Sequence, residues 1–307
     1  MKIIFDMGHP AHVHFFRHAI AELEKRGHTV KVTARDKDVT LRLLDAFGIP
    51  YVVRPTGWRP LNLVRATRFI RKVARELHAD VLVGVHNPYI AGAAVSLKRE
   101  CVLFTDTPGS AFVNRISLEK ASRVVTPQCL AGRFPNQVTY PGFKEMAYLH
   151  PKYFKPDSGA LARAGVSPDG YFLARFISWN AYHDGGMDRT REDERTRIIS
   201  GLGKTLVSLE NCDDGLAAQD LHSLLSQSSG CISEGATLAK EAAVLGIPAA
   251  YVSPLASELP PIKELVKTGR LMVYSNFSSE IVLSPKSAPM EMCNVTSVII
   301  REVEKRD

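Results

Sequence analysis

A repeated rhythm constrains this chain most: short apolar runs alternate with longer stretches of helical period along most of the sequence. Parallel neighbours in a sheet need a long connection, and a helix supplies it while covering one face of the sheet. The runs are apolar throughout, which is typical of strands buried on both faces. We therefore predict parallel α/β sheets. The predicted strands are 2–6, 29–33, 51–54, 80–85, 101–106, 123–126, 171–175, 205–209, 230–233, 248–252 and 271–274.

A stretch rich in Pro, Gly and Asp, at 151–170, interrupts this rhythm, which then resumes. The length of 307 residues also favours two domains over one. We predict an N-terminal domain over 1–155, a C-terminal domain over 165–290, and a closing helix over 291–307. The predicted fold class is α/β, with two doubly wound domains facing a cleft.

Basic residues are concentrated in the first half of the chain. Residues 1–150 hold 22 Lys and Arg against 12 Asp and Glu, whereas residues 151–307 hold 17 against 20. Such an excess favours nucleic acid, an anionic membrane or a phosphorylated substrate as a partner.

Part of the basic excess lies on the helical stretch 54–77. Its cations share one face at spacings of three, four and three, and they are Arg65, Arg68, Lys72 and Arg75. The apolar side is predicted to hold Leu61, Val64, Phe69, Ile70, Val73 and Leu77. A solvated face is the ordinary interpretation. The alternative is a patch for an anionic membrane surface or a pyrophosphate-linked acceptor.

Several classes of protein are disfavoured. No apolar run reaches the ~18 residues that a membrane span needs, and Asp6 stops the first run too early for a signal peptide. We therefore expect a cytoplasmic protein, with peripheral contact on the inner membrane face as the alternative. The five cysteines contain no Cys-x-x-Cys pair, so we expect neither a disulfide frame nor a zinc site.

Ligands of open parallel sheets lie beyond the carboxyl ends of the strands, so residues just after each strand are the candidates. The first such segment is Gly8-His9-Pro10-Ala11-His12-Val13-His14. Three histidines beside a helix N-terminus can bind a metal, act as acid or base, or hold a phosphate or sugar hydroxyl. Metal is the least favoured, because no carboxylate or cysteine nearby completes a ligand set. Alternatively, His12 and His14 only cap and pack the helix start.

The second segment follows the run 230–233 and opens a helix, with the sequence Ser233-Glu234-Gly235-Ala236-Thr237. Glycine and alanine let a diphosphate approach free backbone N–H groups, and Thr237 adds a hydroxyl donor. Glu241 lies on the same helix face and can take both hydroxyls of a ribose. A plain helix N-cap with an exposed glutamate is the alternative.

The third segment runs from Arg175 to Gly186, after the first strand of the second domain. Arg175 offers a fork for phosphate, and Trp179 and Tyr182 offer stacking faces for a sugar or base. His183 with Asp184 is a candidate acid/base pair, although adjacent residues rarely face each other.

The fourth set lies at strand ends in the first domain or at its exit. Asp106 and His86 are candidate acid/base or hydroxyl-binding groups, and Lys144 and Glu145 follow the turn at Gly142. Local turn formation explains Asp and Asn at such positions equally well.

The chain resembles the B-type glycosyltransferase superfamily, whose fold has two Rossmann-like halves. The donor-site segment of that superfamily is similar to Asp220–Leu225 followed by Glu234–Pro248, as found in nucleotide-sugar 2-epimerases and in the N-acetylglucosaminyltransferase of peptidoglycan synthesis. The chain resembles an uncharacterised prokaryotic family within that superfamily more closely, over Asp6–Phe16, Tyr140–Glu145 and Trp179–Asp184.

The resemblance implies a nucleotide-diphosphate sugar in the second domain, with Gly235, Ala236 and Thr237 on the diphosphate, Glu241 on the ribose and Arg175 near the phosphates. It implies that the first domain binds the acceptor and supplies His9 or His12 as base. The segment 210–220 is short, which predicts a trimmed base-recognition loop.

The favoured function is an inverting, metal-independent glycosyltransferase without a cofactor, acting in cell-surface glycan or glycolipid synthesis on an anionic or lipid-linked acceptor. The helix N-terminus and Arg175 stabilise the leaving diphosphate in that reaction. A nucleotide-sugar 2-epimerase is the alternative, for which Asp106 and Glu145 are the candidate carboxylates. A non-catalytic nucleotide or anion binder is a third; nucleic acid is not expected, because no such binding module is present.

Overall fold

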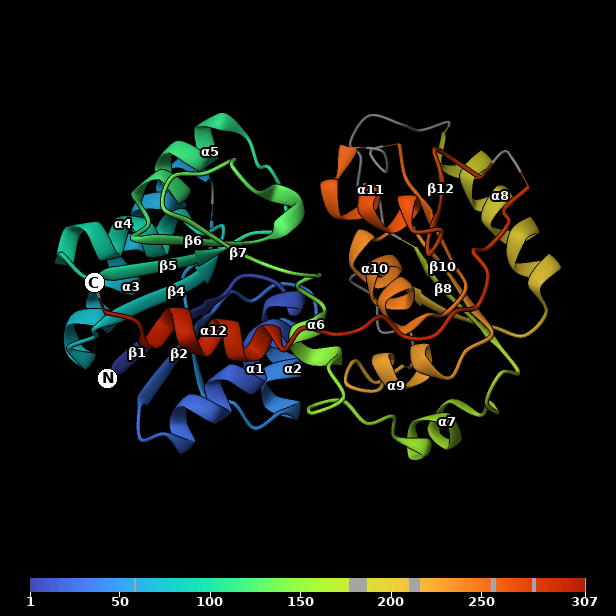
Figure 1. Ribbon diagram of the computed structural model, residues 1–307, viewed down its shortest axis with the longest axis horizontal. Coiled ribbons are helices and arrows are strands. Elements are labelled where there is room, and N and C mark those ends of the chain that lie inside the picture. The colour runs from blue at the N-terminus through green and yellow to red at the C-terminus, as the bar shows by residue number, and fades with distance from the viewer. Residues whose placement is uncertain (58, 177–186, 210–215, 255–257, 278–279, 307) are drawn as a thin grey trace. The chain divides into compact units, whose positions relative to one another are not determined.

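The computed structural model describes residues 1–57, 59–176, 187–209, 216–254, 258–277 and 280–306. The chain divides into two compact units, residues 1–153 with 292–307 and residues 154–291. Each unit is a parallel sheet with helices packed on its faces (Figure 1). The predicted α/β class with two doubly wound domains is thereby confirmed.

The first unit contains a sheet of seven described strands in the order β3-β2-β1-β4-β5-β6-β7, all parallel to their neighbours. The strands are β1 (Lys2–Met7), β2 (Thr29–Ala34), β3 (Tyr51–Val53), β4 (Val81–Val85), β5 (Glu100–Phe104), β6 (Arg123–Pro127) and β7 (Gln137–Tyr140). The helices are α1 (Pro10–Lys25), α2 (Thr40–Ala46), α3 (Arg59–Leu77), α4 (Pro88–Leu97), α5 (Ala111–Ile116), α6 (Met146–Leu149) and α12 (Val295–Glu304). Strand β7 is absent from the sequence prediction, because its four residues carry only one fully buried side chain.

Helix α1 illustrates how the sequence builds this unit. Pro10 opens the helix, where its missing N–H costs nothing, and Gly27 follows the end with a φ of 83°. The apolar face buries Phe16, Ile20 and Leu23 against the sheet. The closing helix is confirmed as α12, which packs against α1 and α6 (Figure 1).

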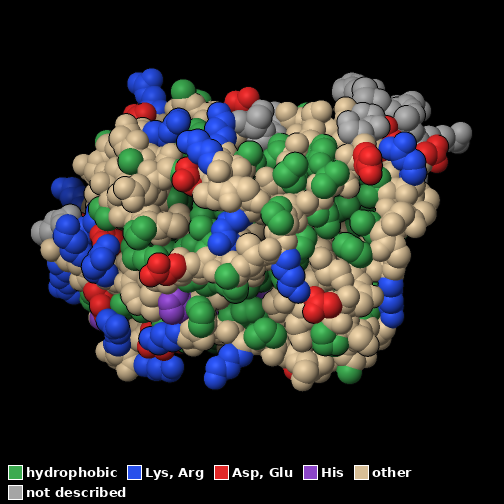
Figure 2. All heavy atoms as spheres, turned by 45° about the vertical axis from the view of Figure 1, so that its right-hand side comes forward, with side chains coloured by type: hydrophobic (Ala, Val, Ile, Leu, Met, Phe, Trp, Pro, Cys, Tyr) green, Lys and Arg blue, Asp and Glu red, His purple; other side chains and the backbone are tan. Residues whose placement is uncertain are grey.

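The predicted orientation of the basic helix α3 is confirmed except at its start. Its four predicted cations are exposed, Ile70 is buried in the core, and Phe69, Val73 and Leu77 pack against the same cluster. Leu61 and Val64, in contrast, are 61% and 46% exposed. Leu61 lies half a turn away from Ile70 around the helix, so the two cannot share a buried face. In the space-filling view, Lys and Arg side chains crowd the surface of the first unit (Figure 2).

The second unit contains a sheet of five described strands in the order β12-β11-β10-β8-β9, again parallel. The strands are β8 (Phe172–Phe176), β9 (Thr205–Leu209), β10 (Gly230–Ser233), β11 (Ala249–Val252) and β12 (Met272–Tyr274). The helices are α7 (Ser158–Ala164), α8 (Met187–Leu202), α9 (Leu221–Ser226), α10 (Ala236–Leu245) and α11 (Pro260–Lys267).

The strand orders locate the ligand-binding edge of each sheet. In the first unit the order reverses between β1 and β4, and in the second it reverses between β8 and β10. Ligands of doubly wound sheets bind at the carboxyl ends of the strands on either side of such a reversal. The turns after β1, β4, β8 and β10 are therefore the places to look for a site.

Candidate functional site

The turn after β10 links the second sheet to α10 and is held by its own hydrogen bonds. The backbone N–H of Gly235 donates to Ser233 Oγ at 3.0 Å, and that hydroxyl donates to the carbonyl of Gly235 at 2.8 Å. Gly235 is the N-cap of α10 and provides no side-chain acceptor. The first amides of α10 are consequently not capped by a side chain of the N-cap residue, which suits a bound anion.

Arg175 lies beside this glycine, because Arg175 on β8 is the register partner of Ser233 on β10. A methyl group added at Gly235 would be 3.9 Å from Arg175 Cδ and 4.0 Å from its Nε. Arg175 Nη1 donates to Ser208 Oγ at 3.1 Å, so a neutral hydroxyl from β9 holds the guanidinium. The predicted neighbours Arg175 and Gly235 are thus brought together at one strand end.

Glu234 does not point outward from the turn. Its side chain is 1% exposed and forms an ion pair with Arg195 of α8. The Arg195 guanidinium lies 4.8 Å from the centroid of the Phe176 ring. The Glu234 carboxylate therefore fixes α8 and the turn to each other.

Glu241 is buried, so the alternative of an exposed glutamate is wrong. His222 Nε2 of α9 lies 3.0 Å from Glu241 Oε1, and both side chains are 4% exposed. Thr237 and Ala236, one turn earlier on α10, are half-buried. The Glu241–His222 pair joins α9 to α10 behind the helix start.

The turn after β1 in the first unit contains a buried polar network that the sequence prediction missed. Asp6 is fully buried and accepts from Thr33 Oγ1 at 2.7 Å and from Asn87 Nδ2 at 2.6 Å. Arg54 Nε donates to both Asp6 oxygens, at 3.1 and 3.2 Å, and the guanidinium lies 4.7 Å from the centroid of the Tyr89 ring. Burial raises the pKa of Asp6, and Arg54 and the two other donors oppose that rise.

His9 and His12 flank the turn and both accept backbone hydrogen bonds through Nδ1. Ala11 N donates to His9 Nδ1 and Gly8 N donates to His12 Nδ1, each at 3.2 Å. A neutral imidazole that accepts at Nδ1 carries its proton on Nε2. Both rings therefore present an N–H at Nε2, and His9 Nε2 lies 3.9 Å from Asp38 Oδ2. His9, rather than His12 or His14, caps α1.

Basic and acidic groups both lie near His12. Burial lowers the pKa of His12 well below its ordinary value; His9, Lys144 and Arg54 lower it further, and Asp106 opposes them. Lys144 Nζ lies 3.0 Å from Asp106 Oδ2, so this carboxylate is already paired. The structure therefore brings together five titratable side chains from the ends of β1, β3, β5 and β7, namely His9, His12, Arg54, Asp106 and Lys144.

His14 does not join this group. It lies two residues along α1 from His12, on another side of the helix, and is 7% exposed. Its ring packs 5.5 Å from Tyr148 and 5.7 Å from Phe47, between ring centroids. His14 is a core side chain, so the expectation that it contacts a substrate is corrected. For His14, the alternative that it packs the start of the helix is therefore correct.

His86 and Glu145 complete the predicted residues of the first unit. His86 has a φ of 42°, and burial lowers the pKa of its imidazole while Asn114 and Asp106 oppose that shift. Its ring lies against Gly109, where an added methyl would be 2.1 Å from His86 Cε1, so that only glycine fits. Glu145 is fully buried beneath the turn at Gly142.

Trp179, Tyr182, His183 and Asp184 lie outside the described residues, as does the segment 210–215. Within the described ranges, no group of three or more His, Cys, Asp or Glu is placed to hold a metal ion. No helix in that part of the chain is both long and apolar enough to cross a membrane.

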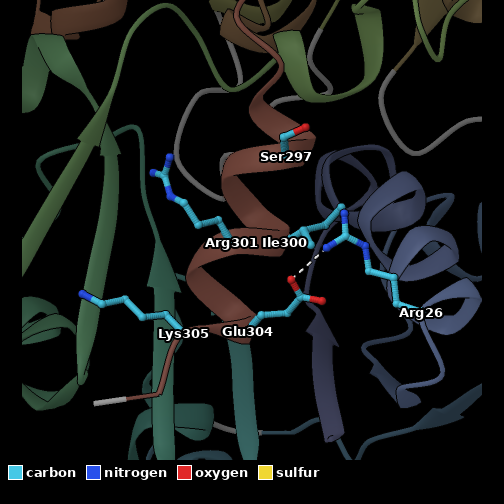
Figure 3. A pocket seen from close by; sticks show the side chains of 6 residues that line it. All are labelled: Arg26, Ser297, Ile300, Arg301, Glu304 and Lys305. Atoms are coloured by element: carbon cyan, nitrogen blue, oxygen red, sulfur yellow. Dashed lines mark hydrogen bonds and ion pairs between the residues drawn. The ribbon is translucent and has the colours of Figure 1, made fainter.

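A surface hollow of about 540 Å³ lies away from the strand ends discussed above (Figure 3). Its walls come from the end of α12 and from Arg26, which donates to Glu304 at 2.9 Å. Arg26 follows α1 and precedes β2, so the hollow lies at the amino ends of the strands. Ligands of parallel sheets bind at the opposite edge, and the hollow is therefore not the candidate site.

The fold is that of the B-type glycosyltransferases and the UDP-GlcNAc 2-epimerases. The UDP-GlcNAc 2-epimerase of Methanocaldococcus jannaschii, in complex with UDP-GlcNAc and UDP, superposes with a TM-score of 0.71 at 12% identity, covering 98% of this chain and 99% of the other. The spinosyn forosaminyltransferase superposes with a TM-score of 0.61 at 14% identity, covering 91% and 87%.

Sequence comparison finds a further relative, an uncharacterised protein of Methanocaldococcus jannaschii, at 22% identity over 92% of this chain and 90% of the other. No family model matches the chain.

Proposed function

We propose that this chain is an enzyme that acts on a nucleotide-diphosphate sugar, held by its second unit. The observation that supports this most is the turn after β10, where an N-cap glycine without a side chain lies against Arg175. An arginine beside uncapped helix amides is suited to a diphosphate, which needs charge and several N–H donors at once.

In this proposal each residue of the turn has a role. The amides of Ala236 and Thr237 and the Arg175 guanidinium bind the diphosphate. Glu241, oriented by His222, stays the proposed partner of the ribose hydroxyls, but its side chain is 4% exposed. When the bond between the anomeric carbon and the diphosphate breaks, negative charge grows on the leaving oxygen. Arg175 and the α10 N-terminus stabilise that charge. Glu234 holds the turn through Arg195.

Epimerisation at C2 is one reaction that begins with this bond cleavage. Its support is the fold, because UDP-GlcNAc 2-epimerases of several organisms share it over nearly the whole chain. The reaction needs side chains that remove and return the proton at C2. Asp106 and Glu145 stay the proposed carboxylates, but Asp106 is paired with Lys144 and Glu145 is fully buried.

Transfer of the sugar to an acceptor hydroxyl is the other reaction. Its support is the first unit, whose exposed cations on α3 suit an anionic or lipid-linked acceptor. His9 and His12 were predicted as bases, yet each carries its proton on Nε2 while Nδ1 accepts a backbone N–H. We therefore propose that they bind the acceptor as hydrogen-bond donors.

The first test is calorimetric titration of the protein with UDP and a panel of nucleotide sugars. Gly235→Ala places a methyl beside Arg175 without a clash, so we expect it to fold and to lose at least tenfold in affinity. Gly201→Ala is the matched control, because nothing lies within 4 Å of a methyl there. Failure of every nucleotide sugar to bind the wild-type protein would sink the proposal.

The second test separates the two reactions. Turnover of the bound nucleotide sugar in deuterium oxide incorporates deuterium at C2 in an epimerase, whereas a transferase incorporates none. Transfer of labelled sugar to a lipid or polysaccharide acceptor identifies the transferase.

A further inference from the structure

Helix α3 of the first unit has an exposed face that the packing of the unit does not use. The helix is held from its other side, where Ala66, Ile70 and Ala74 are at most 2% exposed. On that side Asn62 Nδ2 also donates to Tyr89 Oη of α4, at 3.2 Å. The side chains of the opposite face are therefore not needed to fold the unit.

This opposite face, which we call the outer face of α3, combines aliphatic side chains with cations. Leu61 is 61% exposed and Val64 is 46% exposed. At about 3.6 residues per turn, both fall with four exposed cations within about one third of the helix circumference. The six side chains are Leu61, Val64, Arg65, Arg68, Lys72 and Arg75.

The charge of the outer face is positive. Within the described part of the chain, its ion pair joins Lys72 Nζ to Glu76 Oε1 at 3.8 Å, between side chains that are 75% and 64% exposed. One carboxylate thus stands against four cations, and three positive charges remain. The outer face of a second copy would be repelled by this one, so the charge favours a negative partner.

The aliphatic side chains distinguish between the possible negative partners. A nucleic acid is held by cations, hydrogen-bonding side chains and aromatic stacking, and none of these contacts uses Leu61 or Val64. An anionic bilayer takes both kinds of side chain, because aliphatic groups enter its interface while Lys and Arg are attracted to its charged surface. The outer face is therefore better suited to a bilayer.

The position of the two aliphatic side chains also relates this face to ligand binding. Helix α3 follows β3, so its start lies at the carboxyl end of the first sheet, and Leu61 and Val64 lie near that start. The turns after β1 and β4 open at the same edge of the sheet. A bilayer in contact with the start of α3 would lie beside the edge at which doubly wound sheets bind their ligands.

We propose that the outer face of α3 is a docking surface for an anionic lipid bilayer. Leu61 and Val64 enter the headgroup region, and the cations along the helix contact lipid phosphates. The contact is reversible, because a few charges and two aliphatic groups supply it rather than a spanning segment. The inference rests on the proposed function in one respect only, namely that a lipid-linked acceptor would meet the first unit at this surface.

The test is cosedimentation of the full-length protein with phosphatidylcholine vesicles that contain about one-third phosphatidylglycerol, against vesicles of phosphatidylcholine alone. We expect saturable binding to the anionic vesicles only. Raising sodium chloride from about 0.1 M to about 0.5 M should weaken it about tenfold, because salt screens exposed charges. Equal binding to both kinds of vesicle, or no binding to the anionic ones, would overturn the docking surface.

Two double variants separate the effect of charge from that of aliphatic contact. Arg65→Gln with Arg68→Gln should lower the partition coefficient for anionic vesicles by about tenfold or more. Leu61→Ser with Val64→Ser should lower it by about fivefold to tenfold. A loss in the charge variant without a loss in the aliphatic variant would indicate a polyanion such as RNA as the partner, and would overturn the bilayer.

The matched controls lie on α11 of the second unit. Lys263→Gln with Lys267→Gln removes the same charge from exposed positions, and Val266→Ser removes a valine that is 44% exposed. Both controls should bind anionic vesicles like the wild type, and an equal loss in them would contradict the assignment to α3. All these side chains are exposed, so the urea midpoint of every variant should stay close to that of the wild type.

Calorimetry with UDP on the wild-type protein separates this inference from the proposed function. UDP binding in a protein that does not bind anionic vesicles contradicts the docking surface alone. Vesicle binding that is lost in both double variants, in a protein that binds no nucleotide sugar, supports the docking surface and removes the proposed function.

Discussion

Two turns of this molecule each place a glycine beside an arginine, but they hold the arginine in different ways. After β10 in the second unit, Gly235 lies beside Arg175; after β1 in the first unit, Gly8 lies beside Arg54. Both turns lie where the strand order of a parallel sheet reverses. In each case the missing side chain of the glycine leaves space next to a guanidinium.

The difference lies in what holds each arginine and each helix start. A hydroxyl of Ser208 holds Arg175, whose charge stays uncompensated by that contact, whereas the Asp6 carboxylate holds Arg54. Helix α1 is capped by the His9 side chain, whereas α10 has no side-chain cap. The second turn therefore offers backbone amides and a full positive charge. The first turn offers side chains, and its arginine is already paired with a carboxylate.

Loss of the carboxylate that holds Arg54 should have the largest effect. Asp6→Ala leaves a buried guanidinium unpaired, so we expect the free energy of unfolding in urea to fall by about 3–5 kcal/mol. Arg68→Ala, on the exposed face of α3, is the control and should change stability by less than about 0.5 kcal/mol. A loss below 1 kcal/mol in Asp6→Ala would show that the two arginines are held alike.

Removing Arg175 should affect ligand binding more than folding. Arg175→Ala deletes a charge-assisted contact to the diphosphate, worth about 1.5–3 kcal/mol or about 10–100-fold in affinity for UDP-GlcNAc. Calorimetric titration measures it, with Arg68→Ala again as control. Unchanged affinity would show that the nucleotide does not bind at the turn after β10.

The hydroxyl that holds Arg175 should contribute less than the carboxylate that holds Arg54. Ser208→Ala removes one neutral hydrogen-bond acceptor, so we expect about a fivefold loss in UDP-GlcNAc affinity, near 1 kcal/mol. The chemical denaturation midpoint should stay almost unchanged. A destabilisation as large as that of Asp6→Ala would contradict the contrast between the two turns.

Much of the fold was predictable because buried parallel strands are apolar on both faces. The runs at Thr205–Leu209 and Gly230–Ser233 coincide with β9 and β10. Strand β7 was not predicted because it lies at the edge of the sheet. Fewer of its side chains are buried there, so its sequence has a weaker apolar pattern. On α3 only Leu61 and Val64 were wrongly assigned to the buried side, because the residues that are buried at the start of this helix, Asn62 and Ala66, are polar or small.

The turn after β10 was predictable because glycine and a helix start are adjacent in sequence. The network of Asp6, Thr33, Arg54 and Asn87 was not, because its members come from four separate elements and only the strand order brings them together. A signal existed: Asp6 near the end of an apolar strand and Arg54 directly after another are costly to bury alone. An acidic and a basic residue at such buried positions therefore predict an ion pair between them.

Helix α12 has a consequence for how the protein is made. Because α12 packs on α1 and α6, the chain leaves the first unit after Tyr153 and returns to it at Met292. The second unit is thus an insertion in the first. During synthesis the inserted unit has all its residues before the first unit has its last helix, so α1 and α6 lack one packing partner until α12 is made. Residues 154–291 are the natural fragment to express alone.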